Sequence, residues 1–187
     1  MTVLATPRLQ LRPFTLADHE AHARIYSDAE VMRYMPRGPM TLDVARQASQ
    51  AVLTHFIAHW AEHAYGVWAV TDKSTGTLLG QCGLRFLPEI NEVEVLYLLA
   101  RAHWGQGLAS EAAQAALAYG FDQVGLHRII ALTKPENTAS RRVMEKLGMQ
   151  YEKNLHIFNL EAVYYAMTRQ AWSRRPWTGE PPSRGVC

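Results

Sequence analysis

One segment constrains the fold of this chain more than any other: a β-rich stretch runs into a short glycine loop and then into an alanine-rich helix. The strand is "NEVEVLYLLA", the loop is "RAHWGQG", and the helix is "LASEAAQAALAYGF". A unit of this kind directs several backbone N–H groups and the positive end of the helix dipole toward one point. That point suits an anion with several oxygens, such as a diphosphate, better than a single carboxylate. Two glycines alone leave a second interpretation open, a tight turn that holds no ligand.

The other segments of the 187-residue chain predict one mixed α/β domain over residues 1–172. Further strands are predicted at "RLQLRPF", "YGVWAVTD", "TLLGQCGLRF", "HRIIALT", "MQYEKN" and "EAVYYAMT", which gives about seven in a mostly antiparallel sheet. Helices are predicted after Thr15, from Thr41 to about Ala64, from the glycine loop to about Gln123, and from Thr138 to Leu147. Residues 173–187, polar and proline-rich, are predicted to be a mobile tail.

Composition gives no case for nucleic acid or membrane as a partner. The formal charge of +2 comes from interspersed acidic and basic residues rather than from a basic block. The first dozen residues carry charges and no long apolar core, so we expect neither a signal peptide nor an anchor, and a cytoplasmic location. Cys82 and Cys187 do not make a disulfide framework, which fits a reducing compartment.

Two known phosphate loops and one metal motif do not match. A Walker loop needs Lys and then Ser or Thr after its last glycine, whereas Leu108 and Ala109 follow Gly107 here, and a dinucleotide fingerprint would need a small apolar residue where Ser110 stands. The histidines at positions 55, 59 and 63 recur every four residues, a spacing that permits a shared metal or a solvated or cleft-lining helix face. No Glu follows His55 as a zincin requires, and we predict no metal site.

The chain resembles the GNAT superfamily of acetyltransferases, and especially its RimJ and RimL branch of ribosomal-protein N-terminal acetyltransferases. The resemblance runs in order through "TPRLQLRPFTLAD", "GVWAV", "GTLLGQCGL", "EVEVLYLLARAHWGQGLASEAA", "NTASRRVMEKLGM" and "VYYAMTRQAW". It implies a splayed sheet with helices on both faces, acetyl-CoA in the cleft, and direct attack of an amine on the thioester in a ternary complex. Ala102 departs from the pattern, which prefers Gln or Arg there.

The resemblance also implies which residues bind acetyl-CoA. The pyrophosphate would lie on the loop and helix start, made of Trp104, Gly105, Gln106, Gly107, Leu108, Ala109 and Ser110. Leu98 and Leu99 would offer backbone groups to the pantetheine amides, and Asn137 would also bond the pantetheine.

Two glutamates, Glu92 and Glu94, alternate along the strand before the loop and therefore share one face. A modest base suffices for an α-amine with a pKa near 7.7, because its deprotonation at pH 7 costs about 1 kcal/mol, against about 4.6 kcal/mol for a lysine. Glu94 is the preferred base, since it matches the Glu of the branch's Glu-x-x-Tyr pattern and partial burial there would strengthen it. The alternative is a solvated charge on an edge strand.

The leaving thiolate of CoA also needs a partner. Many superfamily members use a Tyr seven residues after an Asn, but that place holds Met144. Ser140, three residues after Asn137, lies on the adjacent helical turn and matches the Ser of the RimJ and RimL branch, so we predict that it meets the sulfur. The alternative is an ordinary polar residue in a first helical turn.

The acceptor is predicted to be a peptide N-terminus or a small amino acid-like amine. The segments before Tyr65 offer the aromatic residues Tyr26, Tyr34 and Trp60 and few acids, unlike a polyamine pocket. The sequence decides neither the acceptor nor the oligomeric state, and a homodimer is compatible with it. The rival function is a catalytically weak module that binds acyl-CoA as a sensor or partner; the presence of Glu94, Asn137 and Ser140 favours the enzyme.

Overall fold

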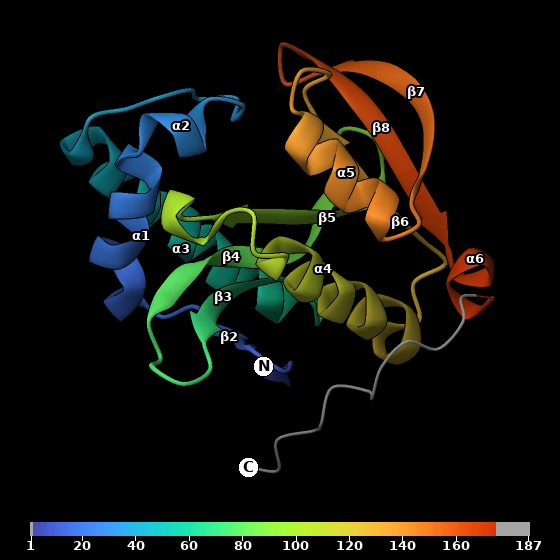
Figure 1. Cartoon of the computed structure of the whole chain (residues 1–187), viewed down its shortest axis with the longest axis horizontal. Coiled ribbons are helices and arrows are strands. Elements are labelled where there is room, and N and C mark those ends of the chain that lie inside the picture. Colours follow the sequence, from blue (N-terminus) through green and yellow to red (C-terminus); the bar gives the residue numbers. More distant parts are fainter. Residues whose placement is uncertain (1, 175–187) are drawn as a thin grey trace.

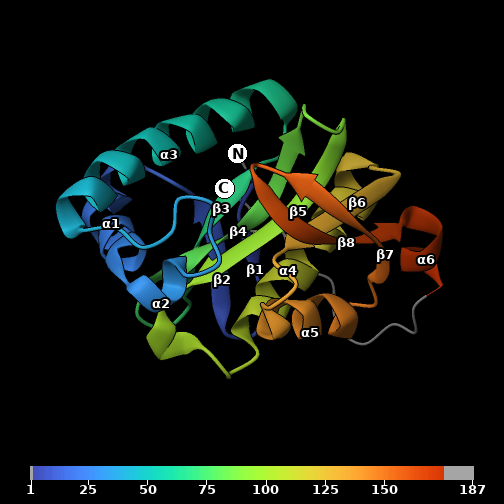
Figure 2. The ribbon, with the colours of Figure 1, turned by 90° about the horizontal axis from the view of Figure 1, so that it is seen from above.

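The computed structural model describes residues 2–174, and these form a single open sheet with helices on both faces (Figures 1 and 2). The sheet has eight strands in the order β1-β2-β3-β4-β5-β6-β8-β7. They are β1 (Leu4–Ala5), β2 (Leu9–Pro13), β3 (Val67–Asp72), β4 (Leu78–Leu87), β5 (Glu92–Leu99), β6 (Arg128–Thr133), β7 (Gln150–Ile157) and β8 (Leu160–Thr168). Only β5 and β6 pair in parallel, which confirms the mixed and mostly antiparallel class. The additional strand is β1, whose two residues are too short to show alternation.

The described helices are α1 (His19–Ser27), α2 (Ala29–Met32), α3 (Leu42–His63), α4 (Leu108–Ala118), α5 (Thr138–Lys146) and α6 (Arg169–Ser173). Four helices, α1, α3, α4 and α5, lie at the predicted positions, whereas the short helices α2 and α6 were not predicted. The hydroxyl of Thr41 caps α3 by accepting from Val44 N, and Ala64 ends it in the left-handed region. Beyond α4 the chain continues as a π-helix over Tyr119–Val124 rather than as an α-helix. The predicted tail lies outside the described residues from residue 175 onward.

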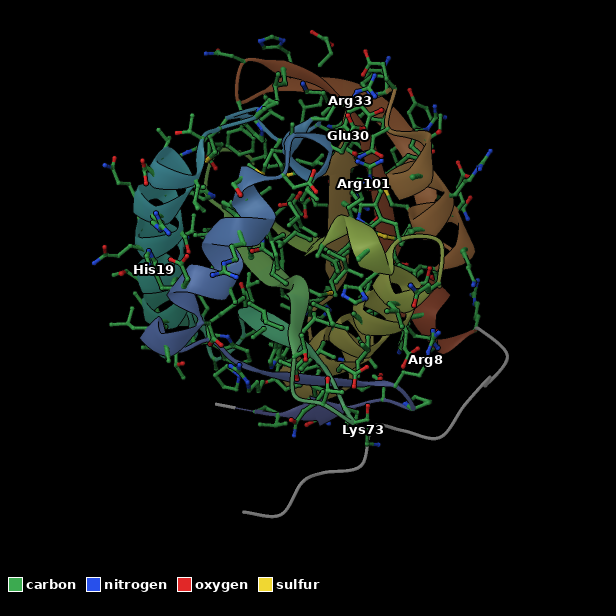
Figure 3. All side chains as sticks on the ribbon, turned by 60° about the vertical axis from the view of Figure 1, so that its left-hand side comes forward. Arg8, His19, Glu30, Arg33, Lys73 and Arg101 are labelled. Carbon is green, nitrogen blue, oxygen red and sulfur yellow. The ribbon has the colours of Figure 1, made fainter. Side chains whose placement is uncertain are left out.

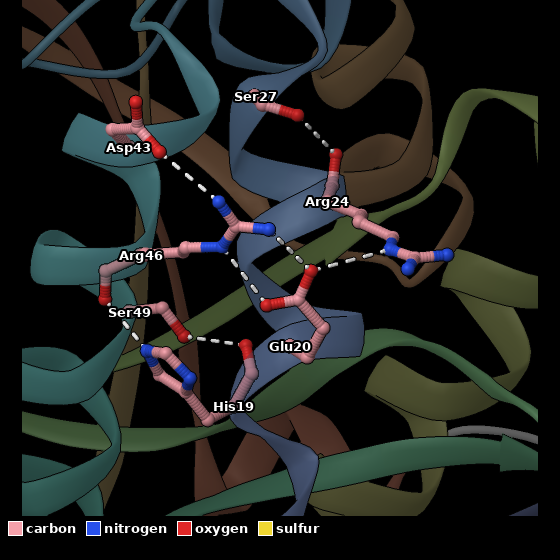
Figure 4. A network of polar contacts seen from close by, with 7 residues as sticks. All are labelled: His19, Glu20, Arg24, Ser27, Asp43, Arg46 and Ser49. Carbon is pink, nitrogen blue, oxygen red and sulfur yellow. Dashed lines mark hydrogen bonds and ion pairs between the residues drawn. The ribbon is translucent and has the colours of Figure 1, made fainter.

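Two helical layers enclose the sheet. In Figure 2, α3 lies along one face and α4 and α5 lie along the other. Polar contacts hold α1 against α3 (Figure 4): Arg46 forms an ion pair of 2.9 Å with Glu20, and Ser49 donates from Oγ to the backbone oxygen of His19 at 3.1 Å. Within residues 2–174, no helix is both long enough and apolar enough to cross a bilayer.

The sheet opens at β5. This strand pairs with β4 along all eight of its residues, but with β6 only at Glu94 opposite Ile130. Beyond that pair β5 and β6 diverge, so the backbone of β5 faces a gap on its β6 side. Alternation sends Val95 and Leu99 into the core beneath α4, and Leu96 and Leu98 into the clusters beneath α1 and α3. Both faces of β5 therefore border the same opening.

Candidate active site

A cavity of about 800 Å³ passes through this opening. On one side it is lined by the glycine loop and the start of α5, and on the other by α1, α2, α3 and the hairpin between β7 and β8. Of the predicted site residues, Glu94, Leu98, Leu99, Trp104, Gly105, Gly107, Leu108, Ala109, Ser110, Asn137 and Ser140 all line it. Gln106 does not line this cavity and instead lines a smaller one on the outer side of the loop.

The glycine loop meets α4 with both glycines in the left-handed region. The φ angle is 73° at Gly105 and 76° at Gly107, which caps the helix. A Cβ built on Gly105 would meet no heavy atom within 4 Å beyond its chain neighbours, so the space beside the loop is open. Glu111 donates the first backbone bond of the helix, to Gly107 O at 3.1 Å, and the N–H groups before it have no partner inside the helix. This is a geometry that receives an oxyanion.

Arg8, labelled in Figure 3, directly precedes β2 and contacts the glycine loop. Its Nη1 donates to Gln106 O at 2.9 Å, and its Nε and Nη2 contact the Glu111 carboxylate at 2.7 and 2.6 Å. Thr6 donates to the same carboxylate at 2.6 Å. The loop is therefore shaped by its own protein contacts, independently of a ligand.

The two leucines at the end of β5 differ in what they offer to the opening. Ala100 N donates to Leu79 O, and bonded pairs alternate along an antiparallel ladder, so the register makes Leu98 and Gln81 a bonded pair. Leu98 thus presents its side chain, whereas the backbone groups of Leu99 face the β6 side. The Leu99 oxygen accepts from Trp104 Nε1 at 2.8 Å, which leaves its N–H for a ligand.

Glu94 is the buried carboxylate of the opening. It is 5 % exposed, and Arg85 on β4 donates from Nη2 to Glu94 Oε2 at 2.6 Å. The alternative of a solvated charge on an edge strand is wrong, because β5 is a central strand. Arg85 was not predicted as a site residue, although a lone Arg in the apolar run "GLRFL" was a visible signal.

Glu92 lies on the same face but outside the cavity. Its Oε1 accepts from the Tyr164 hydroxyl at 2.8 Å and from Arg128 Nε at 3.2 Å. Arg128 in turn contacts Glu152, and the network joins β5, β6, β7 and β8. These contacts give Glu92 a structural role below the opening.

Ser140 occupies the predicted first turn of α5, on the α4 and α5 side of β5. The side chain of Asn137 caps this helix, accepting from Ser140 N at 3.2 Å and donating to Thr133 Oγ1 at 3.0 Å. The Tyr97 hydroxyl lies 3.0 Å from Ser140 O and 3.0 Å from Ser140 Oγ. Tyr97 was noted in the sequence only as part of a pattern, and its contact with α5 was not predicted. Met144, at the place where many relatives carry Tyr, is buried at 1 % exposure.

The histidine face of α3 has a packing role at its centre. His59 is buried, its Nδ1 pairs with Tyr65 O at 3.0 Å, and its Nε2 accepts from Phe86 N at 3.1 Å. Both ring nitrogens are thus engaged by the backbone, and burial lowers the pKa of His59. Among the described residues, no group of three or more His, Cys, Asp or Glu could hold a metal ion.

The part of the cavity that is lined by α1, α2, α3 and the β7–β8 hairpin is mainly apolar. Its wall includes Tyr26, Met32, Tyr34, Met35, Phe56 and Phe158. Two further carboxylates line the cavity, but the side chains of Glu30 and Glu161 are 49 % and 68 % exposed. Glu94 is therefore the carboxylate that an apolar amine would meet at depth.

Comparisons with known proteins identify the family of the chain. The model of the Acetyltransferase (GNAT) domain matches residues 8–150. The Bacillus subtilis (strain 168) protein YkkB is 37 % identical over 174 residues, which cover 88 % of this chain and 94 % of that protein. N-acetyltransferase p20 of Bacillus licheniformis, itself uncharacterized, is 35 % identical over 81 % of this chain and 84 % of its own. A GNAT-family acetyltransferase from Bacillus anthracis, whose crystal structure is known, superposes with a TM-score of 0.75 at 32 % identity, covering 90 % of this chain and 99 % of that one. The chain belongs to the GNAT family of N-acetyltransferases.

Proposed function

We propose that this acetyltransferase moves the acetyl group of acetyl-CoA to a primary amine by direct attack in a ternary complex. The observation that carries the proposal is the continuous cavity through the sheet, which joins the glycine loop and Ser140 on one side of β5 to Glu94 on the other. Members of the GNAT family use acetyl-CoA as co-substrate. The open space at Gly105 and the unbonded N–H groups at the start of α4 fit its diphosphate.

The reaction forms a C–N bond and breaks a C–S bond. The amine attacks the thioester carbonyl carbon, and Glu94, directly or through a water, takes the proton that the nitrogen loses. Arg85 donates to Glu94 Oε2, so we assign the proton to Oε1. The sulfur leaves with the electron pair of the C–S bond, and the Ser140 hydroxyl donates a hydrogen bond to the developing thiolate.

The acceptor that we propose is a peptide N-terminus or a small amino acid-like amine. An α-amine is partly neutral at pH 7 and needs only a modest base such as a carboxylate. The apolar wall with a single deep carboxylate supports one amine on an apolar body, since a second ammonium would lack a buried partner. Ser140 at the opening and the buried Met144 support membership of the RimJ and RimL branch. A cytoplasmic location stays a prediction, with which the free, buried Cys82 is compatible.

A panel of amines tests the proposal. Peptides with free N-termini, amino acid amides and spermidine would each be incubated with acetyl-CoA, and release of free CoA would be followed. We expect turnover with the first two classes and little with spermidine. In parallel, acetyl-CoA and CoA should raise the melting temperature, whereas pantetheine, which lacks the diphosphate, should do so far less. Binding of CoA without turnover on any amine would support the rival function of an acyl-CoA-binding module.

A further inference from the structure

The Tyr97 hydroxyl is bonded to the residue that the proposed function assigns to the leaving sulfur. Tyr97 lies on the face of β5 that packs toward α4 and α5, and its ring contacts the core there. Its oxygen is 3.0 Å from both the backbone oxygen and the side-chain oxygen of Ser140. Both residues line the cavity, so this contact lies at the opening and not behind it.

The hydrogens of this pair can be assigned from chemistry. A backbone oxygen only accepts, so the bond to Ser140 O uses the single hydrogen of the Tyr97 hydroxyl. The Ser140 hydroxyl is then the donor in the second contact. When Ser140 turns its own hydrogen toward the cavity, Tyr97 can hold Ser140 Oγ only by turning its hydrogen from Ser140 O to Ser140 Oγ. An isolated serine on a first helical turn would lack this constraint on its rotamer.

Tyr97 is not itself the acid. Burial raises the pKa of Tyr97 above its ordinary value near 10, while a CoA thiol has a pKa near that of free Cys, about 8.5. A proton transfer from Tyr97 to the thiolate would therefore run uphill. The phenol therefore stays protonated at neutral pH and remains a hydrogen-bond donor.

We propose that Tyr97 is a positioning residue that holds the Ser140 hydroxyl on the leaving sulfur, an inference that rests on the proposed function. As charge develops on sulfur, Ser140 donates to it, and the Tyr97 hydrogen turns from Ser140 O to Ser140 Oγ. Two hydrogen bonds in series then stabilise the thiolate, each strengthening the other. The thiolate leaves as the anion and takes its proton from water after release.

The test compares Tyr97→Phe with Tyr165→Phe. Tyr165 is a matched control, because it is buried at 2 % exposure and its hydroxyl also bonds α5, at Glu145 (2.9 Å) and Arg141 (3.3 Å), but it does not touch Ser140. We expect Tyr97→Phe to lower kcat about three- to tenfold, the effect of one net hydrogen bond, with the KM for acetyl-CoA unchanged. Tyr165→Phe should keep kcat within about twofold, and the melting temperatures show whether either variant is unfolded.

A second readout needs no acceptor. The pKa of the CoA thiol in the binary complex is measured from thiolate absorbance, as the difference between samples with and without CoA. Tyr97→Phe should raise this pKa by about half to one unit, and Ser140→Ala by at least as much. The double variant should resemble Ser140→Ala alone, because Tyr97 acts only through Ser140.

The outcomes distinguish failure of the Tyr97 positioning role from failure of the proposed function. If wild-type enzyme turns over while Tyr97→Phe leaves both kcat and the bound thiol pKa unchanged, or if the two substitutions add fully, the positioning role is refuted and the proposed function stands. If the wild-type enzyme acetylates no amine, the proposed function fails. A bound thiol pKa in Tyr97→Phe equal to that of wild type then refutes the positioning role as well, and a raised value supports it as a property of the CoA site.

Discussion

Replacing Glu94 with Gln tests the base. Gln keeps the shape of the side chain and an oxygen that can accept from Arg85, but it cannot take a proton. At pH 7 about one-sixth of an α-amine with a pKa near 7.7 is neutral, so loss of a group that only deprotonated the substrate would cost at most about sixfold. Loss of a base that acts in the transition state costs about a hundred- to ten-thousandfold. We expect about a hundredfold in kcat/KM, at the low end, because Arg85 already engages one carboxylate oxygen.

The assay is kcat/KM against pH from 7 to 9. In Glu94→Gln it should rise by up to about sixfold as the amine becomes neutral without help, whereas the wild type should change less. The fold should persist, because the Arg85 side chain is 33 % exposed and can be solvated; we expect a loss of about 1 kcal/mol or less, a shift of about 2–4 °C in Tm.

Glu92→Gln is the control, since it removes a carboxylate on the same face that is also paired with an arginine, yet lies outside the cavity. It should lower Tm by a similar amount and leave kcat/KM near the wild-type value. The reasoning is refuted if Glu94→Gln loses less than about sixfold and keeps the wild-type pH profile.

Three further predictions concern the donor side and the buried histidines. Ser140→Ala should lower kcat by about ten- to a hundredfold with the affinity for acetyl-CoA nearly unchanged, measured by steady-state kinetics and calorimetry, because a thiolate is a tolerable leaving group. Gly107→Val should weaken CoA binding in a thermal-shift titration, since Gly107 has a φ of 76°, which disfavours a branched side chain, and that side chain would block the approach of the anion. Unchanged binding would refute the assignment of the diphosphate to this loop. Burial lowers the pKa of His22 and His59, so below about pH 6.5 the unfolded chain binds protons that the folded chain does not, and stability falls between about pH 7 and pH 5. Urea unfolding at both pH values checks this, and His22→Gln combined with His59→Gln should flatten the dependence.

Local features of this fold were predictable from sequence. Alternation and β-rich composition located strands β2 to β8, Thr41 and Thr138 marked the starts of α3 and α5, and the two glycines marked the turn into α4. Each of these signals arises within a few neighbouring residues. The two-residue β1 carries no such signal, because its pairing with β2 depends on a neighbour and not on its own pattern.

The site partners were less predictable because they depend on register across the sheet. Arg85 meets Glu94 through the pairing of β4 with β5, and Tyr97 meets Ser140 through the packing of α5 on β5. Sequence spacing placed Glu94 on a face but could not show whether its strand was central or at an edge, since that depends on where β6 returns. The strand order decides it: β5 lies between β4 and β6, and Glu94 is buried.

The alternation of side chains along β5 has a kinetic consequence. Tyr97 and Glu94 point to opposite faces of the sheet, so in the proposed mechanism the thioester and the amine approach from opposite sides and neither blocks the exit of the other. Free CoA should therefore compete with acetyl-CoA but not with the amine in product-inhibition experiments. For the same reason, an inhibitor that joins both substrates in one molecule must pass through the gap between β5 and β6. Its linker therefore needs a small cross-section where the two strands diverge.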